Sequence, residues 1–473
     1  VPSIRLTRPE IYYGETTHEP VFVRSNQPEF NYPAGNENVQ TQYEGRGGIP
    51  IGDFGMRLAS AIVYADHKLL LTSLLRPESR MLIRRNVRER VSSVAGFIDW
   101  DVDPYLVVTA EGRLVWMIDG YTSSDRHPYS RKLRLRDTGA LNYMRNSVKA
   151  VVDAYDGTMS FYIFDAGDPI VRAFNAMFPE LFQPASAMPP DLRAHARYPE
   201  LLFSSQAEIY RTFHMTDPEA FYNREDLWDL GKHVYQQSKE PEPLPPTFVV
   251  ATLPGESKPE YLLVQSFTPR SKDNLIGVMM ARSDGPNLGQ LVVLQLSKQS
   301  LIYGPLQIEA RIDSDQVISK DLTLWNQQGS QVLRGQTLVL PIADTFLYVE
   351  PIYIQSAQAK MPQLRKVVLA MGNRLVYRDT YEEAIAELTG TEGRSSSGTG
   401  TAETSQAQQG SAEATAAAVA PTAPSTPSPP APSGDPRIQA IRDHLRRYRE
   451  LSAQGRLAEA GRELEAVMNL AGR

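Results

Sequence analysis

The chain has 473 residues, of which 41% are hydrophobic and 22% are charged, and its formal net charge at pH 7 is −6. This length predicts about two to four domains, with ample material for a hydrophobic core. The charges are mixed in sign along the chain, which does not favour a nucleic-acid surface, because phosphate binding needs a concentrated basic patch. The chain has no cysteine, which excludes disulfides, thiol catalysis, thiolate zinc sites and iron–sulfur clusters.

The apolar runs are short. None approaches the roughly 20 residues that a membrane-spanning helix needs. Two of the longest, Leu275–Ala281 and Leu291–Leu296, have the length of buried strands or short helices. The sequence begins at Val1 without a signal-peptide pattern, so we expect a mature or excised piece of a longer protein.

Residues 1–52 are rich in Pro, Gly, Asn and Tyr and predict a long irregular segment with short strands. Its GRGG turn at 45–48 could cradle an anion or be a plain tight turn. Asp53 is a predicted N-cap for a helix over Phe54–Ala65. The apolar residues of that helix recur at helical spacing: Phe54, Leu58, Ala61, Ile62 and Ala65.

The most basic part of the chain follows, in the segment 78–90. One interpretation is a solvated helix face with local ion pairs, and the other is contact with anionic lipid or an acidic partner. The arginines concerned are Arg80, Arg84, Arg85, Arg88 and Arg90.

Residues 97–165 carry the densest set of carboxylates and aromatic rings. The apolar runs Tyr105–Thr109 and Leu114–Ile118 flank Glu111-Gly112 and predict a hairpin, so the polar side chains lie on strand ends and turns. From these we predict a ligand-binding site formed by Asp99, Asp101, Asp103, Asp119, Tyr121 and Arg145.

A weak calcium possibility attaches to Asp99, Asp101 and Asp103, which are spaced like the start of a calcium loop. That loop needs Gly at its sixth and Glu at its twelfth position, where this chain has Pro104 and Ala110. A calcium site of another geometry and a polar turn both stay open. No other cofactor or metal and no catalytic residue is predicted, because no complete catalytic motif is present.

Further along, Asn142–Ala154 predicts a helix or a buried segment, and a turn at 155–158 leads into a strand over Met159–Phe164. Residues 168–235 favour helices, with Asp217-Pro218 as one helix start. After the proline-rich segment 239–246 the pattern is β-rich, and Tyr381–Leu388 predicts a helix. The fold class is therefore α+β, with mixed, mostly antiparallel sheets, helices and a C-terminal helical hairpin.

Four regions follow from these patterns. Residues 391–434 are low in complexity, rich in Ser, Thr, Ala and Pro, and predict a disordered linker. Two amphipathic helices then form a hairpin that cannot bury its apolar faces alone, so we expect it to dock on a protein partner or on this chain. The regions are 1–240 (an α+β subdomain), 247–390 (a β-rich subdomain), 391–434 (the linker) and 435–473 (the hairpin).

The succession of motifs resembles one family, the uncharacterised protein family 0182 of bacterial integral membrane proteins. The resemblance covers about residues 1–390 and rests on several long stretches in order. It implies a multi-pass protein whose N-terminal membrane helices precede this segment, with this segment on the extracytoplasmic side of the cell membrane. Among the matching stretches are RLTRPEIYYGE (5–15), DPYLVV (103–108), DGYTSSDRHPYS (119–130), NYMRNSVKAVVDAYDG (142–157) and LWNQQGSQVLRG (324–335).

Three functions stay open from the sequence. The first is a non-enzymatic interaction or structural role in a membrane or envelope complex. The second is a glycan- or peptide-binding or hydrolytic domain with its site around residues 97–165, since aromatic rings beside carboxylates suit sugars. The third is an accessory domain of a transporter. None of them involves nucleic acid.

Overall fold

The computed structural model describes residues 5–390, with gaps at 36, 136–138, 235–239, 298, 300, 328, 344 and 357–360, together with Arg447. The contacts group Val1–Ser397 into one unit and Gly398–Arg473 into another. The predicted linker 391–434 and, Arg447 apart, the predicted hairpin 435–473 lie outside the described residues. The division of the first unit at residues 240–247 stays a prediction, and all that follows concerns that unit.

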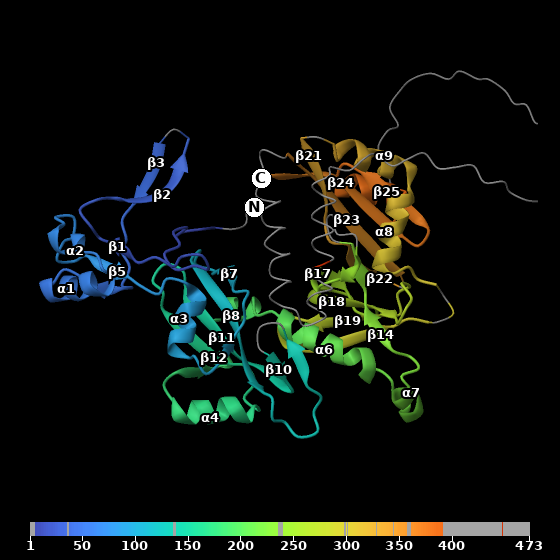
Figure 1. Ribbon diagram of the computed structural model, residues 1–473, viewed down its shortest axis with the longest axis horizontal. Coiled ribbons are helices and arrows are strands. Elements are labelled where there is room, and N and C mark those ends of the chain that lie inside the picture. The colour runs from blue at the N-terminus through green and yellow to red at the C-terminus, as the bar shows by residue number, and fades with distance from the viewer. Residues whose placement is uncertain are drawn as a thin grey trace, which may run out of the picture. The chain divides into compact units, whose positions relative to one another are not determined.

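The predicted α+β class is confirmed for the described residues, which form helices and mostly antiparallel sheets (Figure 1). A six-stranded sheet carries the segment 97–165, with the order β13-β12-β11-β8-β6 and with β7 also paired to β8. Only β12 and β13 run parallel within it. Its strands are β6 (Asp99–Trp100), β7 (Tyr105–Val108), β8 (Leu114–Ser124), β11 (Tyr143–Asp153), β12 (Met159–Ile163) and β13 (Phe182–Pro184).

Strand β11 resolves the choice left open for 142–154, which is a strand and not a helix. Its buried residues alternate between two cores, as a strand with both faces covered requires. Val148, Ala150 and Val152 enter the larger core with Tyr13, whereas Val151 enters a smaller core on the opposite face. The predicted hairpin at 105–118 and the turn before β12 are both confirmed.

The N-terminal residues form a lobe beside this sheet (Figure 1). Asp53 caps helix α1 as predicted, accepting a hydrogen bond from the Met56 N–H at 3.2 Å. The elements of the lobe are β1 (Val21–Val23), β2 (Glu29–Ala34), β3 (Glu37–Thr41), β4 (Ile49–Pro50), α1 (Phe54–Val63), α2 (Lys68–Leu71) and β5 (Arg80–Leu82). Helix α3 (Val87–Val94) follows and packs on the six-stranded sheet, with Val87 and Val91 in its larger core (Figure 1).

The arginines of segment 78–90 do not form the expected face of local ion pairs. Arg80, Arg85 and Arg90 instead donate to backbone carbonyl oxygens of Gly47, Tyr12 and Gly157, at 2.6, 2.7 and 2.7 Å. They therefore connect separate segments of the N-terminal part and, through Arg90, join that part to the turn before β12.

Helices predominate between the sheets, as predicted. Asp168 and Asp217 cap α4 and α7, and a proline follows each as the first helical residue. The short strands β9 (Leu133–Leu135) and β10 (Gly139–Leu141) precede these helices. The helices are α4 (Pro169–Met177), α5 (Pro190–Ala194), α6 (Glu200–Phe213) and α7 (Pro218–Asn223), with a 3₁₀ turn at Ala185–Ala187.

The remaining chain is β-rich, as predicted, with two five-stranded antiparallel sheets. The first contains β14 (Trp228–Leu230), β17 (Thr247–Thr252), β18 (Pro259–Pro269), β19 (Gly277–Arg282) and β20 (Leu291–Gln295). The second contains β21 (Ser330–Arg334), β22 (Leu338–Ile342), β23 (Thr345–Ser356), β24 (Pro362–Met371) and β25 (Arg374–Arg378). A two-stranded ribbon, β15 (Lys232–His233) and β16 (Glu242–Pro243), precedes them, and the helices of this part are α8 (Pro305–Ser314), α9 (Gln316–Trp325) and α10 (Tyr381–Thr389).

The cores tie these parts together. One core joins the two five-stranded sheets to α8 and α9 through residues such as Ile308, Ile312 and Ile318. Another joins α6 to the first of these sheets through Phe203 and Phe267. Among the described residues, no helix combines the length and the apolar content that a membrane crossing requires.

Candidate functional site

The six-stranded sheet places the predicted site residues on neighbouring strands. Asp99 on β6 lies opposite Tyr121 on β8, and Asp119 on β8 lies opposite Lys149 on β11. Because side chains alternate along a strand, Asp119 and Tyr121 share one face of the sheet. Arg145 lies on β11 just before an irregularity in its pairing with β8.

Asp119 and Lys149 form a buried ion pair between the two longest strands of this sheet. Their side chains are 4% and 3% exposed. The Lys149 ammonium also donates to the carbonyl oxygen of Arg197 at 3.0 Å. Burial of a charge is tolerated only when the charge is paired and hydrogen-bonded, so Asp119 is held as the partner of this lysine.

Asp101 lies beneath the same face and binds Tyr121. Its carboxylate accepts a hydrogen bond from the Tyr121 hydroxyl and another, at 3.0 Å, from the N–H of Asp103. Burial raises the pKa of Asp101, and these two hydrogen bonds oppose the rise. Burial likewise raises the pKa of Tyr121, with the charges of Asp119 and Asp101 adding to the effect. Tyr121 is therefore a hydrogen-bond donor to the carboxylate.

The three aspartates considered for calcium bind three different partners. Asp99 is exposed and accepts from the Ser123 hydroxyl, Asp101 accepts from Tyr121, and Asp103 pairs with Arg197 at 2.9 Å. Across the described residues, no group of three or more His, Asp or Glu side chains is arranged to hold a metal ion. The calcium site stays a prediction without a carboxylate cluster to support it.

Arg145 lines a cavity of about 310 Å³ beside β11 and the start of α6. It pairs with Asp165 across the cavity wall, with 3.0 Å between Nη1 and Oδ2. Lys149 and Arg197 contribute two further cations to the lining. The remaining lining residues are Met144, Asn146, Phe164, Tyr198, Pro199, Leu202, Gln206, Leu288 and Gly289.

Each cation of this cavity already has a carboxylate partner. Arg145 binds Asp165, Lys149 binds Asp119 and Arg197 binds Asp103. The Arg197 guanidinium also lies 4.1 Å from the centre of the Tyr105 ring, a cation–π contact. Such a wall offers hydrogen bonds to a polar ligand but no uncompensated charge. Of the predicted residues only Arg145 lines the cavity, and Asp119 reaches it through Lys149.

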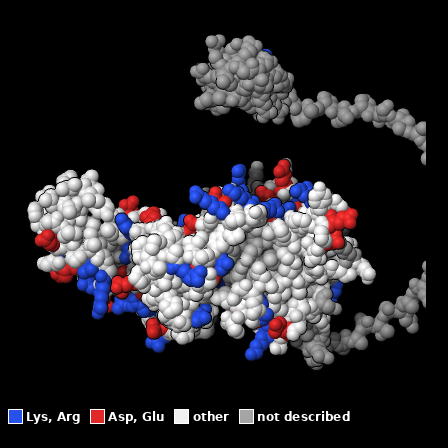
Figure 2. Space-filling model, turned by 90° about the horizontal axis from the view of Figure 1, so that it is seen from below, with Lys and Arg blue, Asp and Glu red and all other residues white. Residues whose placement is uncertain are grey.

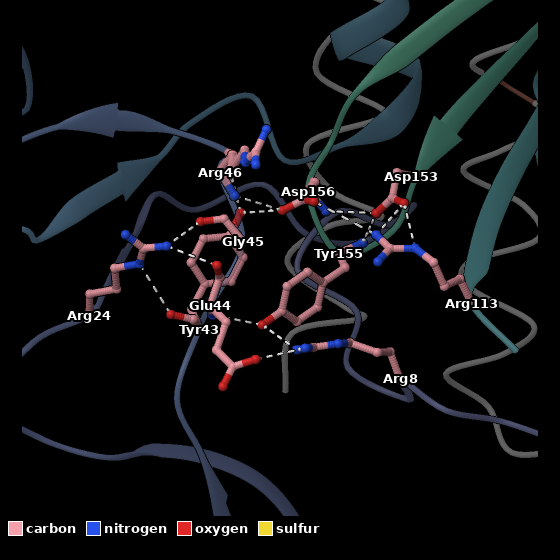
Figure 3. A network of polar contacts seen from close by, with 11 residues as sticks. Arg8, Arg24, Tyr43, Glu44, Gly45, Arg46, Arg113, Asp153, Tyr155 and Asp156 are labelled. Carbon is pink, nitrogen blue, oxygen red and sulfur yellow. Dashed lines mark hydrogen bonds and ion pairs between the residues drawn. The ribbon is translucent and has the colours of Figure 1, made fainter. Parts of the chain in front are cut away.

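A second polar cluster surrounds the turn between β11 and β12 (Figure 3). Asp153 accepts from the N–H groups of Tyr155 and Asp156 at 2.8 and 2.7 Å, and from Arg113 at 2.6 Å. The Tyr155 hydroxyl accepts from Arg8 at 2.9 Å and from the Glu44 N–H at 2.8 Å. This network joins the N-terminal segment to the turn between the inner strands β11 and β12.

The GRGG turn belongs to this network. The Arg46 N–H donates to the Asp156 carboxylate at 3.0 Å, and the Tyr43 hydroxyl donates to it at 2.9 Å. A Cβ on Gly45 would lie 1.9 Å from Oδ1 of Asp156, which explains the glycine there. The turn does bind an anion, but that anion is a side chain of the same protein.

Comparison with known proteins identifies the family of the chain. The model of the Uncharacterised protein family (UPF0182) matches residues 1–325. The chain belongs to this family. A UPF0182 protein of Solibacter usitatus is 60% identical over 466 residues, which cover 98% of this chain and 49% of that protein. Relatives from Pelotomaculum thermopropionicum and Desulforamulus reducens are 47% and 46% identical over 82% of this chain, and 42% and 41% of their own lengths are covered.

The chain thus spans about half or less of the length of these relatives, and their names state no activity. No solved structure matches the chain. The family is established by these comparisons, and the function must be argued from the molecule.

Sequence reasoning missed three charged residues that make several polar contacts, which are Lys149, Arg197 and Asp168. Lys149 stands within the apolar run of β11, and Asp119 stands within that of β8, so one opposite charge in each of two neighbouring strands was the signal for their pairing. Arg197 gave no signal, because its contacts come from distant segments. Asp168 caps α4 and also accepts hydrogen bonds from Thr122, Ser147 and Tyr143. Burial opposes the change, but these hydroxyl donors bring the pKa of Asp168 below its usual value.

Proposed function

We propose that this chain is the extracytoplasmic part of a multi-pass protein of the cell membrane, where it has an interaction or structural role rather than a catalytic one. The observation that carries this proposal is an exposed apolar surface on the lobe of α1 and α2. A second, weaker candidate is a polar-ligand-binding domain.

The apolar surface arises because α1 exposes most of its apolar residues to solvent instead of burying them in a core. Its periodic apolar residues predicted a helix, and only Ser60 and Ala61 of that helix are buried. Ile62, Val63 and Leu71 are 72%, 74% and 80% exposed. We define the lobe surface by its exposed apolar residues, which are Phe54, Met56, Leu58, Ile62, Val63, Tyr64, Leu71 and Leu74.

Exposed apolar surfaces of this extent usually mark a contact with a protein or a membrane. Figure 2 shows the end of the lobe as mostly uncharged surface, with Asp and Glu as well as Lys and Arg side chains along its lower border. Lys68, the first residue of α2, is an exposed cation with no side-chain partner in the described part of the chain. Exposed apolar residues with a cation beside them suit the interface of a bilayer with anionic lipids. We therefore assign the lipid bilayer as the occupant of the lobe surface.

The test is co-sedimentation of the 473-residue chain with phosphatidylglycerol vesicles. Each side chain buried in the bilayer contributes about 1.5–3 kcal/mol, so the triple variant Ile62→Ser, Val63→Ser, Leu71→Ser should lose most of its vesicle binding. The matched control changes two exposed apolar residues elsewhere, Val250→Ser and Val317→Ser, which are 67% and 62% exposed, and should bind as the unchanged chain does. Equal binding by the triple variant and the control would reject the bilayer as the occupant.

The membrane side needs a separate measurement. A phosphatase reporter joined to the end of this segment in its natural polypeptide should be active, because such a reporter folds only outside the cytoplasm. Activity of a cytoplasmic reporter at the same position would contradict the extracytoplasmic assignment.

The cavity beside Arg145 supports the second candidate, a site for an uncharged polar ligand such as a glycan. Its aromatic and hydrogen-bonding walls suit such a ligand, but Asp119 and Asp103 are bound by cations and Asp101 by a tyrosine. This pairing favours binding over hydrolysis, which needs two carboxylates free to act. Oligosaccharides that raise the melting temperature of the unchanged chain, but not of Gln206→Ala, would support it.

A further inference from the structure

A second and larger cavity lies at the end of α6, away from the predicted site. Its volume is about 510 Å³, within the range of about 300–1,000 Å³ that is typical of small-molecule sites. Four segments surround it: the end of α6, helix α7, the start of β14 and the residue after β18. The loop after β8 adds Arg131.

The lining is basic. Four arginines and two carboxylates line the cavity, so the lining carries two excess positive charges. Arg211 binds both carboxylates, with 2.6 Å to Glu208 and 2.5 Å to Asp229, and it also donates to the Trp228 carbonyl oxygen at 3.0 Å. Arg211 therefore links α6 to β14 and pairs with both carboxylates of the lining.

The other three arginines have no such partner. Arg131, Arg224 and Arg270 form no side-chain hydrogen bond, ion pair or ring contact with any described residue. They come from three separate segments and meet at one cavity. Arg224 ends α7 in the left-handed conformation, with φ 55°, a backbone state that is uncommon for a residue other than glycine.

Apolar and polar groups complete the lining. The rings of Phe213 and Phe221 lie 5.4 Å apart and line the cavity. Trp228 also lines it, is 4% exposed, and its indole N–H has no hydrogen-bond partner among the described residues. A buried donor without an acceptor is uncommon in folded proteins.

From these contacts we infer that the cavity formed by Arg131, Arg224 and Arg270 binds the anionic phosphate group of a phosphate ester, with the rest of that ligand against Phe213 and Phe221. Guanidinium groups match phosphate oxygens in geometry and in charge. The two excess charges of the lining equal those of a phosphate monoester dianion and also compensate the single charge of a phosphodiester headgroup. Phosphate esters reach such a site either as soluble polyol or sugar phosphates or as headgroups of anionic phospholipids.

The experiment titrates the 473-residue chain with glycerol 3-phosphate in a calorimeter, and in parallel with vesicles of phosphatidylglycerol or phosphatidylcholine. Loss of one charged hydrogen-bond donor should weaken phosphate binding about tenfold, so Arg224→Gln and Arg270→Gln should each show this loss. Arg172→Gln is the matched control, because Arg172 is an exposed arginine on α4 without a side-chain partner among the described residues. It should bind as the unchanged chain does.

The two arms separate the sources of the phosphate group. Arginine-dependent binding of glycerol 3-phosphate supports the inference with a soluble ligand. Arginine-dependent binding of phosphatidylglycerol vesicles alone, measured in the triple serine variant of the lobe surface, supports it with a lipid headgroup. Absence of binding in both arms, or equal binding by Arg224→Gln, Arg270→Gln and Arg172→Gln, overturns it. Because the lobe variant leaves this cavity intact, failure here is distinct from failure of the bilayer proposal.

Discussion

The turn at 153–156 and the arginine cavity use the same residue type in opposite ways. At the turn, Arg113 binds Asp153 at 2.6 Å, and Arg8 binds Glu44 at 2.7 Å (Figure 3). Around the cavity, Arg224 and Arg270 have no side-chain partner in the described part of the chain. Both regions join segments that are distant in sequence, but only the first is complete without a ligand.

This difference separates arginines that build the fold from arginines that are available for binding. A charged side chain with a full set of internal partners contributes to stability, and its loss leaves the partner unsatisfied. An exposed arginine without a partner contributes little to the folded state. Stability measurements on the two regions therefore test the comparison, before any ligand is known.

The largest effect is expected at Asp153. Asp153→Ala removes the acceptor of two turn N–H groups and of Arg113, so the free energy of unfolding should fall by about 3 kcal/mol. Asp153→Asn keeps an acceptor oxygen for the turn and should lose only about 1 kcal/mol. Urea unfolding followed by circular dichroism gives both values. Equal losses for the two variants would show that the charge of Asp153, and not the turn, matters.

Local signals in the sequence were enough for much of the fold. Asp53 and Asp217-Pro218 marked the starts of α1 and α7, and the apolar runs around Glu111-Gly112 marked the β7–β8 hairpin. Capping and turn chemistry act over a few residues, so a sequence displays them directly. The helix α9 was not foreseen in the β-rich part, since its short apolar pattern resembles that of a strand.

The sites could be predicted only in part, because their contacts are distant in sequence. Arg145 lines a cavity, but its neighbours Lys149 and Arg197 come together only through strand register and the chain leading into α6. The exposure of the apolar side of α1 could not be predicted either, since helical periodicity shows that one side is apolar and does not show what covers it. The prediction of a ligand at Asp99, Asp101, Asp103, Asp119, Tyr121 and Arg145 stays a prediction.

An intermediate effect on stability is expected around Arg334, which pairs with two carboxylates. Arg334 binds Glu350 and lies 2.6 Å from Asp313, while Glu309 accepts from Thr337 at 3.2 Å and from the Val234 N–H at 2.8 Å. Burial raises the pKa of Glu309 to about 7, and the charge of Glu350 adds to the rise. This carboxyl group is thus incompletely compensated.

The raised pKa predicts how stability changes with pH. The folded protein keeps a proton on Glu309 between pH 4.5 and about 7 that the unfolded chain releases, so the stabilisation is present below pH 4.5 and is lost as pH rises through 7. Each unit of pKa difference corresponds to about 1.4 kcal/mol, so the free energy of unfolding should fall by about 2.5 kcal/mol between pH 5 and pH 8. Glu309→Gln cannot titrate and should remove this part of the fall in urea titrations. An unchanged pH dependence in that variant would assign the proton to another group.

The smallest effect on stability is expected at the arginine cavity, and it is the one that decides the comparison. The double variant Arg224→Gln, Arg270→Gln removes two exposed cations that have no side-chain partner to leave unsatisfied. Without a ligand, its free energy of unfolding should stay within about 0.5 kcal/mol of the unchanged chain. A loss as large as that of Asp153→Ala would mean that these arginines build the fold after all, because a residue kept for a ligand stabilises the protein only when the ligand is bound.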